Sequence, residues 1–318
     1  MRDGNWLLGW GMASSAYPVT PPGGPQRARA RIFADGSAVV QSSFADFGTG
    51  SATAMTQVAA DGLGLPLERV RVQYGDSDLP NTAAAVGSAG AGMVSAAVHI
   101  AATALRDQLI AQAVADERSP LHGADPRQVV VGDGRMALRD RPGTGETYAE
   151  LLQRSFMADA EALGTWNPPG METRAASMTF GAQFAQVAVD PELGLCRVRQ
   201  LIGVFDPGRV LNRKTAHSQL MGGMLWGMSH ALLEGTIMGP DGRWANASLG
   251  EYLVPVNADA PDVLIETIET TDTVVNPLGV KGVGEVGMVG TAAAIANAIW
   301  HATGRRHHKL PITVEDLL

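Results

Sequence analysis

Cysteine is almost absent from this chain of 318 residues, which contains a single one, Cys196. One thiol cannot form a disulfide within the chain, and it cannot supply a four-cysteine iron–sulfur cluster or a cysteine-rich zinc site. Cys196 lies between apolar residues in a strand-like run, so we expect it to be a small, buried hydrophobic side chain.

Long apolar runs are also missing, since no stretch of about 18 apolar residues is available to form a membrane-spanning helix. The opening MRDGNWLLGWGM differs from a signal peptide because Asp3 and Gly4 precede a very short apolar run. We therefore expect a cytoplasmic protein, or a periplasmic one if a partner chain carries an export signal.

Positive charge is in the minority, because 24 Lys and Arg residues face 32 Asp and Glu residues. The net charge of −8 argues against a nucleic-acid-binding protein. Hydrophobic residues make up 45% of the chain and charged residues 18%, which predicts a globular protein. Its length is sufficient for two lobes with substantial cores.

Two stretches of similar design indicate a weak internal duplication. Residues 27–43 alternate polar and apolar residues about an Asp-Gly turn, and residues 184–203 do so about DPELG, so each predicts a β-hairpin. Each is followed by an Asp-x-Gly triplet and a predicted helix, near 51–63 and 216–234. We predict an α+β fold of two similar lobes, 1–165 and 175–318, although chance similarity of the two hairpin units is an alternative.

Other helices are predicted from composition and periodicity. The Ala-rich residues 92–117, the short segment 148–156 and the apolar residues 289–303 each fit a helix. In the Met-rich helix near 216–234, Gly222 and Gly223 predict close packing. A loop at 164–176 is expected to join the lobes, and Thr313-x-x-Asp316 predicts a short capped helix at the end.

Gly282-Val283-Gly284-Glu285-Val286-Gly287 fits the pattern GxGxxG of dinucleotide-binding folds. That mechanism needs a second strand after the helix and an acid about 20 residues on. No apolar strand follows Gly304, and Glu285 would stand where the pyrophosphate should lie. A nicotinamide-dependent dehydrogenase therefore remains only a minor alternative.

Glu285 is a candidate catalytic carboxylate. The glycines around it let a ligand approach and remove side chains that could pair with it, and poor solvation would raise its pKa toward that of a base at neutral pH. The alternative is a glutamate that only caps a helix, which would stabilise it by about 0.3–1 kcal/mol. The residues alone do not decide between the two.

Two small-residue loops, DFGTGSAT (46–53) and AAAVGSAGAG (83–92), each precede or open a predicted helix. Backbone N–H groups at such places bind phosphate or another anion, whereas tight packing alone is the alternative for either loop. Together with the loop at Glu285 they favour an anionic cofactor.

Several of these stretches together resemble one family, the molybdenum-containing large subunit of xanthine dehydrogenases and aldehyde oxidases. Residues 276–313, with NPLGVKGVGEVGMVGTAAAIANAIWHATG, are similar to its C-terminal signature. Residues 46–80 and 203–223 are similar to cofactor-binding stretches, and the opening residues 1–18 look like the bacterial aldehyde-oxidising branch. The resemblance covers nearly the whole chain.

The resemblance implies a role for particular residues. Glu285 falls on the family's catalytic glutamate, which deprotonates a molybdenum-bound hydroxide that attacks the substrate carbon while hydride passes to a molybdenum-bound sulfide. The implied contacts with molybdopterin come from Phe47, Gly48, Thr49, Gly50, Gly87, Ser88, Ala89 and Gly90, and from Lys281, Gly282, Val283 and Gly284 beside the glutamate. The metal is held through the pterin dithiolene and not by side chains.

The implied cofactor is molybdenum with molybdopterin, extended by a nucleotide, usually cytosine in bacteria. The iron–sulfur cluster (2Fe-2S) and FAD are expected on partner chains, because the cysteine count excludes the first from this chain. The upstream half of the family's large subunit has no counterpart here, so we expect a C-terminal part of a split or processed subunit. Its expected partners are the N-terminal half, an iron–sulfur subunit and possibly an FAD subunit.

Three residues depart from the family pattern. Thr49 stands where other members have Gln, Arg213 replaces a usual Pro, and Trp226 replaces a Gln of purine-oxidising members. The prediction is therefore an aldehyde oxidised to a carboxylic acid, with an N-heterocycle or purine as the alternative substrate. A non-catalytic assembly module that retains the fold is the alternative from another class.

Overall fold

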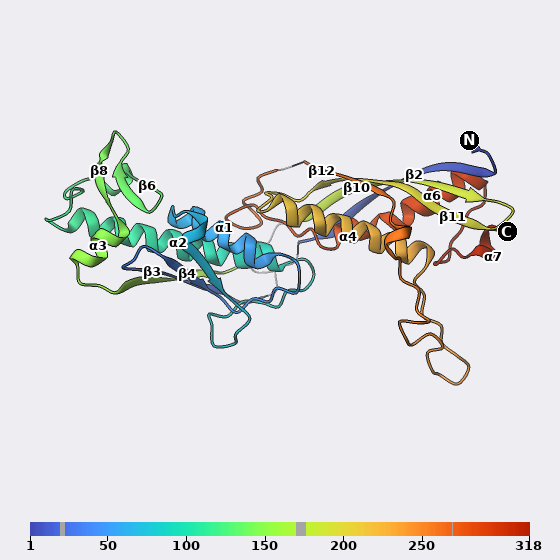
Figure 1. Cartoon of the computed structure of the whole chain (residues 1–318), viewed down its shortest axis with the longest axis horizontal. Coiled ribbons are helices and arrows are strands. Elements are labelled where there is room, and N and C mark those ends of the chain that lie inside the picture. Colours follow the sequence, from blue (N-terminus) through green and yellow to red (C-terminus); the bar gives the residue numbers. More distant parts are fainter. Residues whose placement is uncertain (20–22, 170–175, 269) are drawn as a thin grey trace. The chain divides into compact units, whose positions relative to one another are not determined.

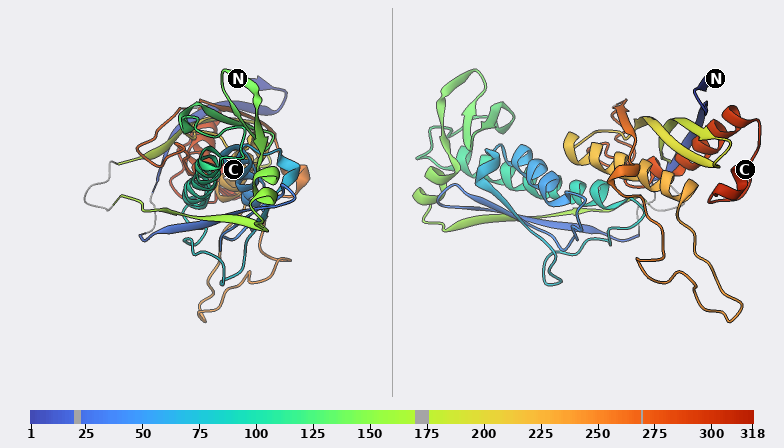
Figure 2. Two further views of the ribbon diagram at one scale, coloured as in Figure 1. Left: turned by 90° about the vertical axis from the view of Figure 1, so that its left-hand side faces the viewer. Right: turned by 45° about the vertical axis from the view of Figure 1, so that its right-hand side comes forward.

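The computed structural model describes residues 1–19, 23–169, 176–268 and 270–318. It has an α+β fold, as predicted, with helices packed on separate, mainly antiparallel sheets. The chain forms two compact units: unit 1 contains Met1–Val19, Ala176–Thr270 and Lys281–Leu318, and unit 2 contains Thr20–Ala175 and Thr271–Val280. Each is described in turn (Figures 1 and 2).

Unit 1 is built on a five-stranded sheet with the order β1-β2-β10-β11-β12. The predicted second hairpin is present as β10 and β11, which are antiparallel and longer than expected. Strand β12 joins β11 in parallel, and β2 pairs with β10 from Leu7 to Pro18. The strands are β1 (Arg2–Asp3), β2 (Trp6–Pro18), β10 (Met178–Asp190), β11 (Leu195–Asp206) and β12 (Asp262–Thr267).

One face of this sheet is covered by α4 (Arg213–Leu232) and α6 (Thr291–Thr303), with the short α5 (Val286–Val289) before α6 (Figure 1). Helix α4 begins earlier than predicted because the Asn212 side chain accepts a hydrogen bond from the Thr215 N–H at 3.0 Å. The core between helices and sheet consists of aliphatic residues and methionines, including Val187, Leu201, Phe205, Met224, Ile295 and Ile299.

Two short helices complete unit 1. A 3-10 helix, η3 (Asn257–Asp259), precedes β12, and the chain ends in α7 (Val314–Leu317). The predicted capping box is present, since Thr313 N–H donates to the Asp316 carboxylate at 2.9 Å. Between α4 and η3 the chain leaves the sheet as a long extended arm (Figure 2).

Unit 2 contains a four-stranded sheet with the order β5-β4-β3-β9, packed against α1 and α2 (Figure 1). The predicted first hairpin is present as β3 and β4, and the two helices lie within two residues of the predicted bounds. The elements are β3 (Gln26–Phe33), β4 (Ala38–Gln41), α1 (Ser51–Leu63), η1 (Leu67–Arg69), β5 (Val70–Gln73), α2 (Gly90–Ala115) and β9 (Asp159–Trp166).

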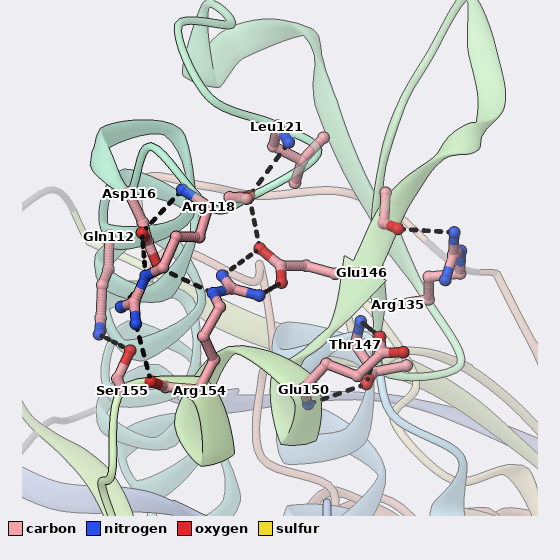
Figure 3. Close-up of polar contacts among 12 residues, drawn as sticks. Gln112, Asp116, Arg118, Leu121, Arg135, Glu146, Thr147, Glu150, Arg154 and Ser155 are labelled. Atoms are coloured by element: carbon pink, nitrogen blue, oxygen red, sulfur yellow. Dashed lines mark hydrogen bonds and ion pairs between the residues drawn. The ribbon is translucent and has the colours of Figure 1, made fainter.

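A smaller three-stranded sheet of unit 2 has no counterpart among the described residues of unit 1. It contains β6 (Val129–Gly132), β7 (Arg135–Leu138) and β8 (Arg141–Thr147), preceded by η2 (Pro126–Gln128) and followed by α3 (Tyr148–Arg154). Arg154 joins it to α2, because its guanidinium binds both the buried Glu146 carboxylate and Asp116 (Figure 3). Ser119 also donates to Glu146, at 2.5 Å, so this buried carboxylate is fully partnered.

The compact units are discontinuous in sequence, whereas the predicted lobes 1–165 and 175–318 are continuous. Residues 1–19 belong to unit 1 because β2 pairs with β10. Residues 271–280 belong to unit 2, where a Cβ on Gly92 of α2 would meet the Val280 carbonyl at 3.1 Å. The predicted lobe boundaries stay a prediction, and much of the expected linker 164–176 lies outside the described residues.

Candidate functional site

Glu285 directly precedes α5 and is neither fully buried nor fully exposed. It occupies the position of a helix cap, yet its side chain makes no capping hydrogen bond to the α5 amides. The alternative that Glu285 serves only as a helix cap therefore has no capping hydrogen bond in its support. The predicted single helix over 289–303 is divided at Gly290, between α5 and α6.

The Tyr17 hydroxyl on β2 donates a hydrogen bond to the Glu285 carboxylate. This bond, together with burial and the negative charge of Glu285, raises the pKa of Tyr17 to about 12. Tyr17 therefore stays protonated, and remains a donor, at any pH near neutrality. No pattern in the sequence marks Tyr17 as a site residue.

Two buried polar side chains of β10 hold the backbone on both sides of Glu285. Thr179 Oγ1 donates to the Gly282 carbonyl at 2.8 Å, and Gln183 Nε2 donates to the Val286 carbonyl at 2.8 Å. Both residues are fully buried. Polar residues at inward positions of an apolar strand, four apart, were the sequence signal that could have identified them.

Close packing of glycines fixes α5 against α4. A Cβ on Gly287 would meet the Leu220 carbonyl at 2.7 Å, and one on Gly223 would meet Gly287 Cα at 3.2 Å. The prediction of close packing is thus correct for Gly223, whereas a Cβ on Gly222 would meet nothing within 4 Å. Glu285 therefore precedes a helix that has little freedom to shift.

Lys281, a predicted cofactor contact, is nearly buried, with its Nζ 3.4 Å from Asp206. Its N–H donates to the Pro207 carbonyl at 3.1 Å. Burial alone would raise the pKa of Asp206, but hydrogen bonds from Thr270 and Gly208 and the charge of Lys281 hold that pKa below its usual value. Within this unit Lys281 thus anchors the start of the Glu285 segment to the end of β11.

The loop Phe47–Gly50 in unit 2 is organised around Asp46. The Asp46 carboxylate accepts hydrogen bonds from the N–H groups of Gly48, Gly50 and Ala52 at 3.0, 3.2 and 2.9 Å. Burial alone would raise the pKa of Asp46, but these bonds hold it below its usual value. The amides of Gly48 and Gly50 are therefore engaged within the chain, and a ligand would have to use other groups, such as the exposed Phe47 ring.

The second loop, Gly87–Gly90, opens α2. Gly87 and Ser88 both adopt positive φ, 57° and 55°, and turn the chain into a helix of 26 residues. The first turn of α2 contains no acidic residue, and the side chains at its start are small. This arrangement fits a bound phosphate, because the helix N-terminus attracts an anion and nothing there repels one.

The predicted site residues thus fall into two groups. Glu285 and Lys281–Gly284 lie together in unit 1, whereas Phe47–Gly50 and Gly87–Gly90 lie in unit 2. Among the described residues, no group of three or more His, Cys, Asp or Glu side chains is placed to bind a metal ion.

The whole chain is similar to known molybdenum-binding subunits. Residues 1–261 match the molybdopterin cofactor-binding domain. The chain is 37% identical to the aldehyde oxidoreductase molybdenum-binding subunit PaoC of Escherichia coli K12, covering all of this chain and 41% of PaoC. It is 30% identical to the xanthine dehydrogenase molybdenum-binding subunit of Escherichia coli O157:H7, covering 99% of this chain and 42% of that one.

The fold matches solved structures as well. The crystal structure of quinoline 2-oxidoreductase from Pseudomonas putida 86 superimposes with a TM-score of 0.88 at 27% sequence identity, over 98% of this chain and 42% of that chain. The chain thus spans about two fifths of the length of the relatives that it matches.

Proposed function

Since the chain belongs to the molybdopterin cofactor-binding domain family, we propose that it is the C-terminal part of a molybdenum hydroxylase subunit that oxidises an aldehyde to a carboxylic acid. The observation that carries the proposal is Glu285, a carboxylate at the start of α5 that is held by Tyr17 and does not cap the helix. The similarity to PaoC, an aldehyde oxidoreductase subunit, supports an aldehyde as substrate.

In this proposal Glu285 is the general base. Molybdenum bound by molybdopterin would supply the redox centre that accepts the electrons of the aldehyde. The Glu285 carboxylate accepts the proton of the water-derived oxygen that attacks the carbonyl carbon, and the fixed backbone on both sides of it keeps the acceptor in place. A general base of this kind accelerates a reaction by about 10²–10⁴, which corresponds to roughly 3–5 kcal/mol.

Substitution of the base is the direct test. In the complex assembled with its partner chains, Glu285→Gln should lower aldehyde turnover at least about 100-fold, because an amide cannot accept the proton. Molybdenum content should stay near that of the parent complex, since the substitution keeps the shape of the side chain. Glu117→Gln, at an exposed position of unit 2, is the matched control.

Two results would count against Glu285 as base: turnover retained by Glu285→Gln, or molybdenum lost together with activity. A complex that contains neither molybdenum nor pterin, alone or with its partners, would favour the alternative of a non-catalytic assembly module.

An N-heterocycle is the second candidate substrate, favoured by the similarity to quinoline 2-oxidoreductase. Trp226, which is half exposed, stands where purine-oxidising members have Gln, and this disfavours purines. Parallel assays of one complex with an aldehyde and with quinoline decide between the two classes, since the better substrate has the higher kcat/KM.

The proposed cofactor is a nucleotide-extended molybdopterin, with cytosine as the expected base. The loops 47–50 and 87–90 and the segment 281–284 are its proposed contacts, and the start of α2 is the proposed phosphate site. Mass spectrometry of the material released from the complex identifies the nucleotide. No helix of the described residues meets the length and apolarity needed to cross a bilayer; a cytoplasmic location remains a proposal that cell fractionation tests.

The proposed partners are a chain corresponding to the upstream part of the relatives, an iron–sulfur subunit and possibly an FAD subunit. More than half of each relative's length lies outside the match. The outer face of the unit 1 sheet supports the first partner. There Met12, Phe184, Ile202 and Leu264 form one row across four strands in register, and Met12 and Leu264 are each more than half exposed.

A further inference from the structure

Strands β2 and β10 present one polar row beneath the Glu285 segment. Tyr17 is paired with Thr179, Ser15 with Gly181 and Ala13 with Gln183. Because paired residues of antiparallel strands point to the same face, these side chains lie on the side opposite to Met12 and Phe184. The row therefore faces the helices and not the outer side of the sheet.

This row is bound to the Glu285 segment at two fixed points. Thr179 holds the Gly282 carbonyl, three residues before Glu285, and Gln183 holds the Val286 carbonyl directly after it. Gln183, on β10, also donates from Nε2 to Ser15 Oγ of β2 at 3.0 Å, so its amide group binds both β2 and the Glu285 segment. The backbone that carries Glu285 is thus tied to the same two strands that carry Tyr17.

Gly181 shows how closely the row is packed. A Cβ at this position would lie 2.4 Å from the Phe205 ring and 2.8 Å from Ser15 Oγ. A side chain at position 181 would therefore collide with residues of both neighbouring strands, Phe205 on β11 and Ser15 on β2. Tyr17 packs with its ring against the core of the unit while its hydroxyl reaches the carboxylate.

From this geometry we propose that Tyr17 is a positioning residue for Glu285, whose hydroxyl holds one carboxylate oxygen so that the other faces the substrate side. The proposal rests on the proposed role of Glu285 as general base. A hydrogen bond from a donor on a rigid strand fixes the rotation of a flexible carboxylate side chain. The entropy of fixing that side chain is then lost on folding and does not add to the activation free energy of the reaction. The high pKa of Tyr17 keeps the donor intact during turnover.

Tyr17→Phe tests the proposal, because it removes the hydroxyl and keeps the packed ring. In the assembled complex we expect kcat to fall about 10- to 100-fold, the range for a hydrogen bond to a charged group, while KM changes less than about twofold. Molybdenum content and Tm should match those of the parent. In the double variant Tyr17→Phe/Glu285→Gln, activity should be no lower than in Glu285→Gln alone.

Tyr252→Phe is a matched control from the same unit. Its hydroxyl donates to the Glu234 carboxylate at 3.0 Å, so the variant removes the same kind of hydrogen bond away from Glu285. We expect kcat and KM of this control to equal those of the parent.

The possible outcomes separate this proposal from the proposed function. If Glu285→Gln is inactive while Tyr17→Phe behaves like Tyr252→Phe, Glu285 is the base and the positioning role is wrong. If Glu285→Gln retains activity, the proposed function fails, whatever Tyr17→Phe does. A rise in KM without a change in kcat, or a parallel loss of metal and Tm in Tyr17→Phe, would also overturn the positioning role.

Discussion

At the scale of single residues, Glu285 is held by groups that lie far from it in the sequence. A glutamate among glycines is visible in one short segment, so local reasoning reached it. Tyr17 and Thr179 lie far from Glu285 in the sequence, and their contacts arise only from strand pairing that no local pattern specifies. The small-residue pattern also could not show that the Asp46 carboxylate binds the amides of Gly48 and Gly50, so these amides are not available to an anion.

Gly90→Ala tests the proposed phosphate site at the start of α2. The structure tolerates the extra methyl group, because the nearest atom to a Cβ there is 3.5 Å away and φ is not positive. A methyl group in a loop that must approach a phosphate should therefore lower the bound nucleotide several-fold while Tm stays within about 2 °C. Quantification of pterin and nucleotide per complex measures this.

Gly132→Ala in β6 is its control, because a Cβ there would also meet nothing close. Equal nucleotide content in Gly90→Ala and Gly132→Ala would show that the start of α2 does not contact the cofactor.

At the scale of elements, helices and hairpins were predicted well because their signals are local. Alternation about a tight turn specified both hairpins, and α1 has the predicted bounds, 51–63. The cap at Asn212 and the interruption at Gly290 were missed, since the first depends on one hydrogen bond and the second on the close approach of Gly290 to the Gln183 side chain of β10. The ion-pair cluster of Arg154 was missed for a related reason: its two carboxylate partners, Asp116 and Glu146, lie in separate parts of the sequence (Figure 3).

Arg154→Met should destabilise unit 2. The substitution keeps much of the aliphatic packing but leaves the Glu146 carboxylate, whose side chain is only 4% exposed, without its cation. Removal of one partner from a buried pair costs about 3–5 kcal/mol. Chemical denaturation with a probe in unit 2 measures the change in the free energy of unfolding.

Arg127→Met is the control, because its ion pair with Asp125 is on the surface and should contribute at most about 1 kcal/mol. Similar losses in the two variants would show that the buried cluster has no special role in stability.

At the scale of the whole molecule, the α+β class followed from the two hairpin–helix patterns, but the division of the chain did not. Strand β2 of unit 1 is separated in the sequence from its partner β10 by residues 20–175 of unit 2. A sequence read from one end to the other cannot show such a return. The outer face of the same sheet was equally hidden, because its apolar row combines residues from four strands.

Leu264→Glu should weaken binding of the upstream chain without unfolding unit 1. Leu264 is 53% exposed on β12, so a charge there is tolerated in the free chain but would be costly in an apolar interface. We expect at least a 10-fold loss of affinity in a co-purification or binding assay with that chain, and an unchanged Tm of this chain alone.

Val130→Glu, at an exposed position of β6 in unit 2, is the control. If Leu264→Glu binds the upstream chain as tightly as the parent does, this face does not bind that chain. If the substitution instead shifts a monomer–dimer equilibrium of this chain, the face binds a second copy.

The return of the chain to β2 also has a consequence for synthesis on the ribosome. Residues up to Pro18 are synthesised well before the strand that pairs with them, which begins at Met178, about 160 residues later. At a translation rate of about 5–20 residues per second, β2 stays without its partner strand for on the order of ten seconds. Chaperones that bind nascent chains at the ribosome should therefore raise the yield of folded protein. Slower translation should lower that yield, because the strand stays unpaired for longer.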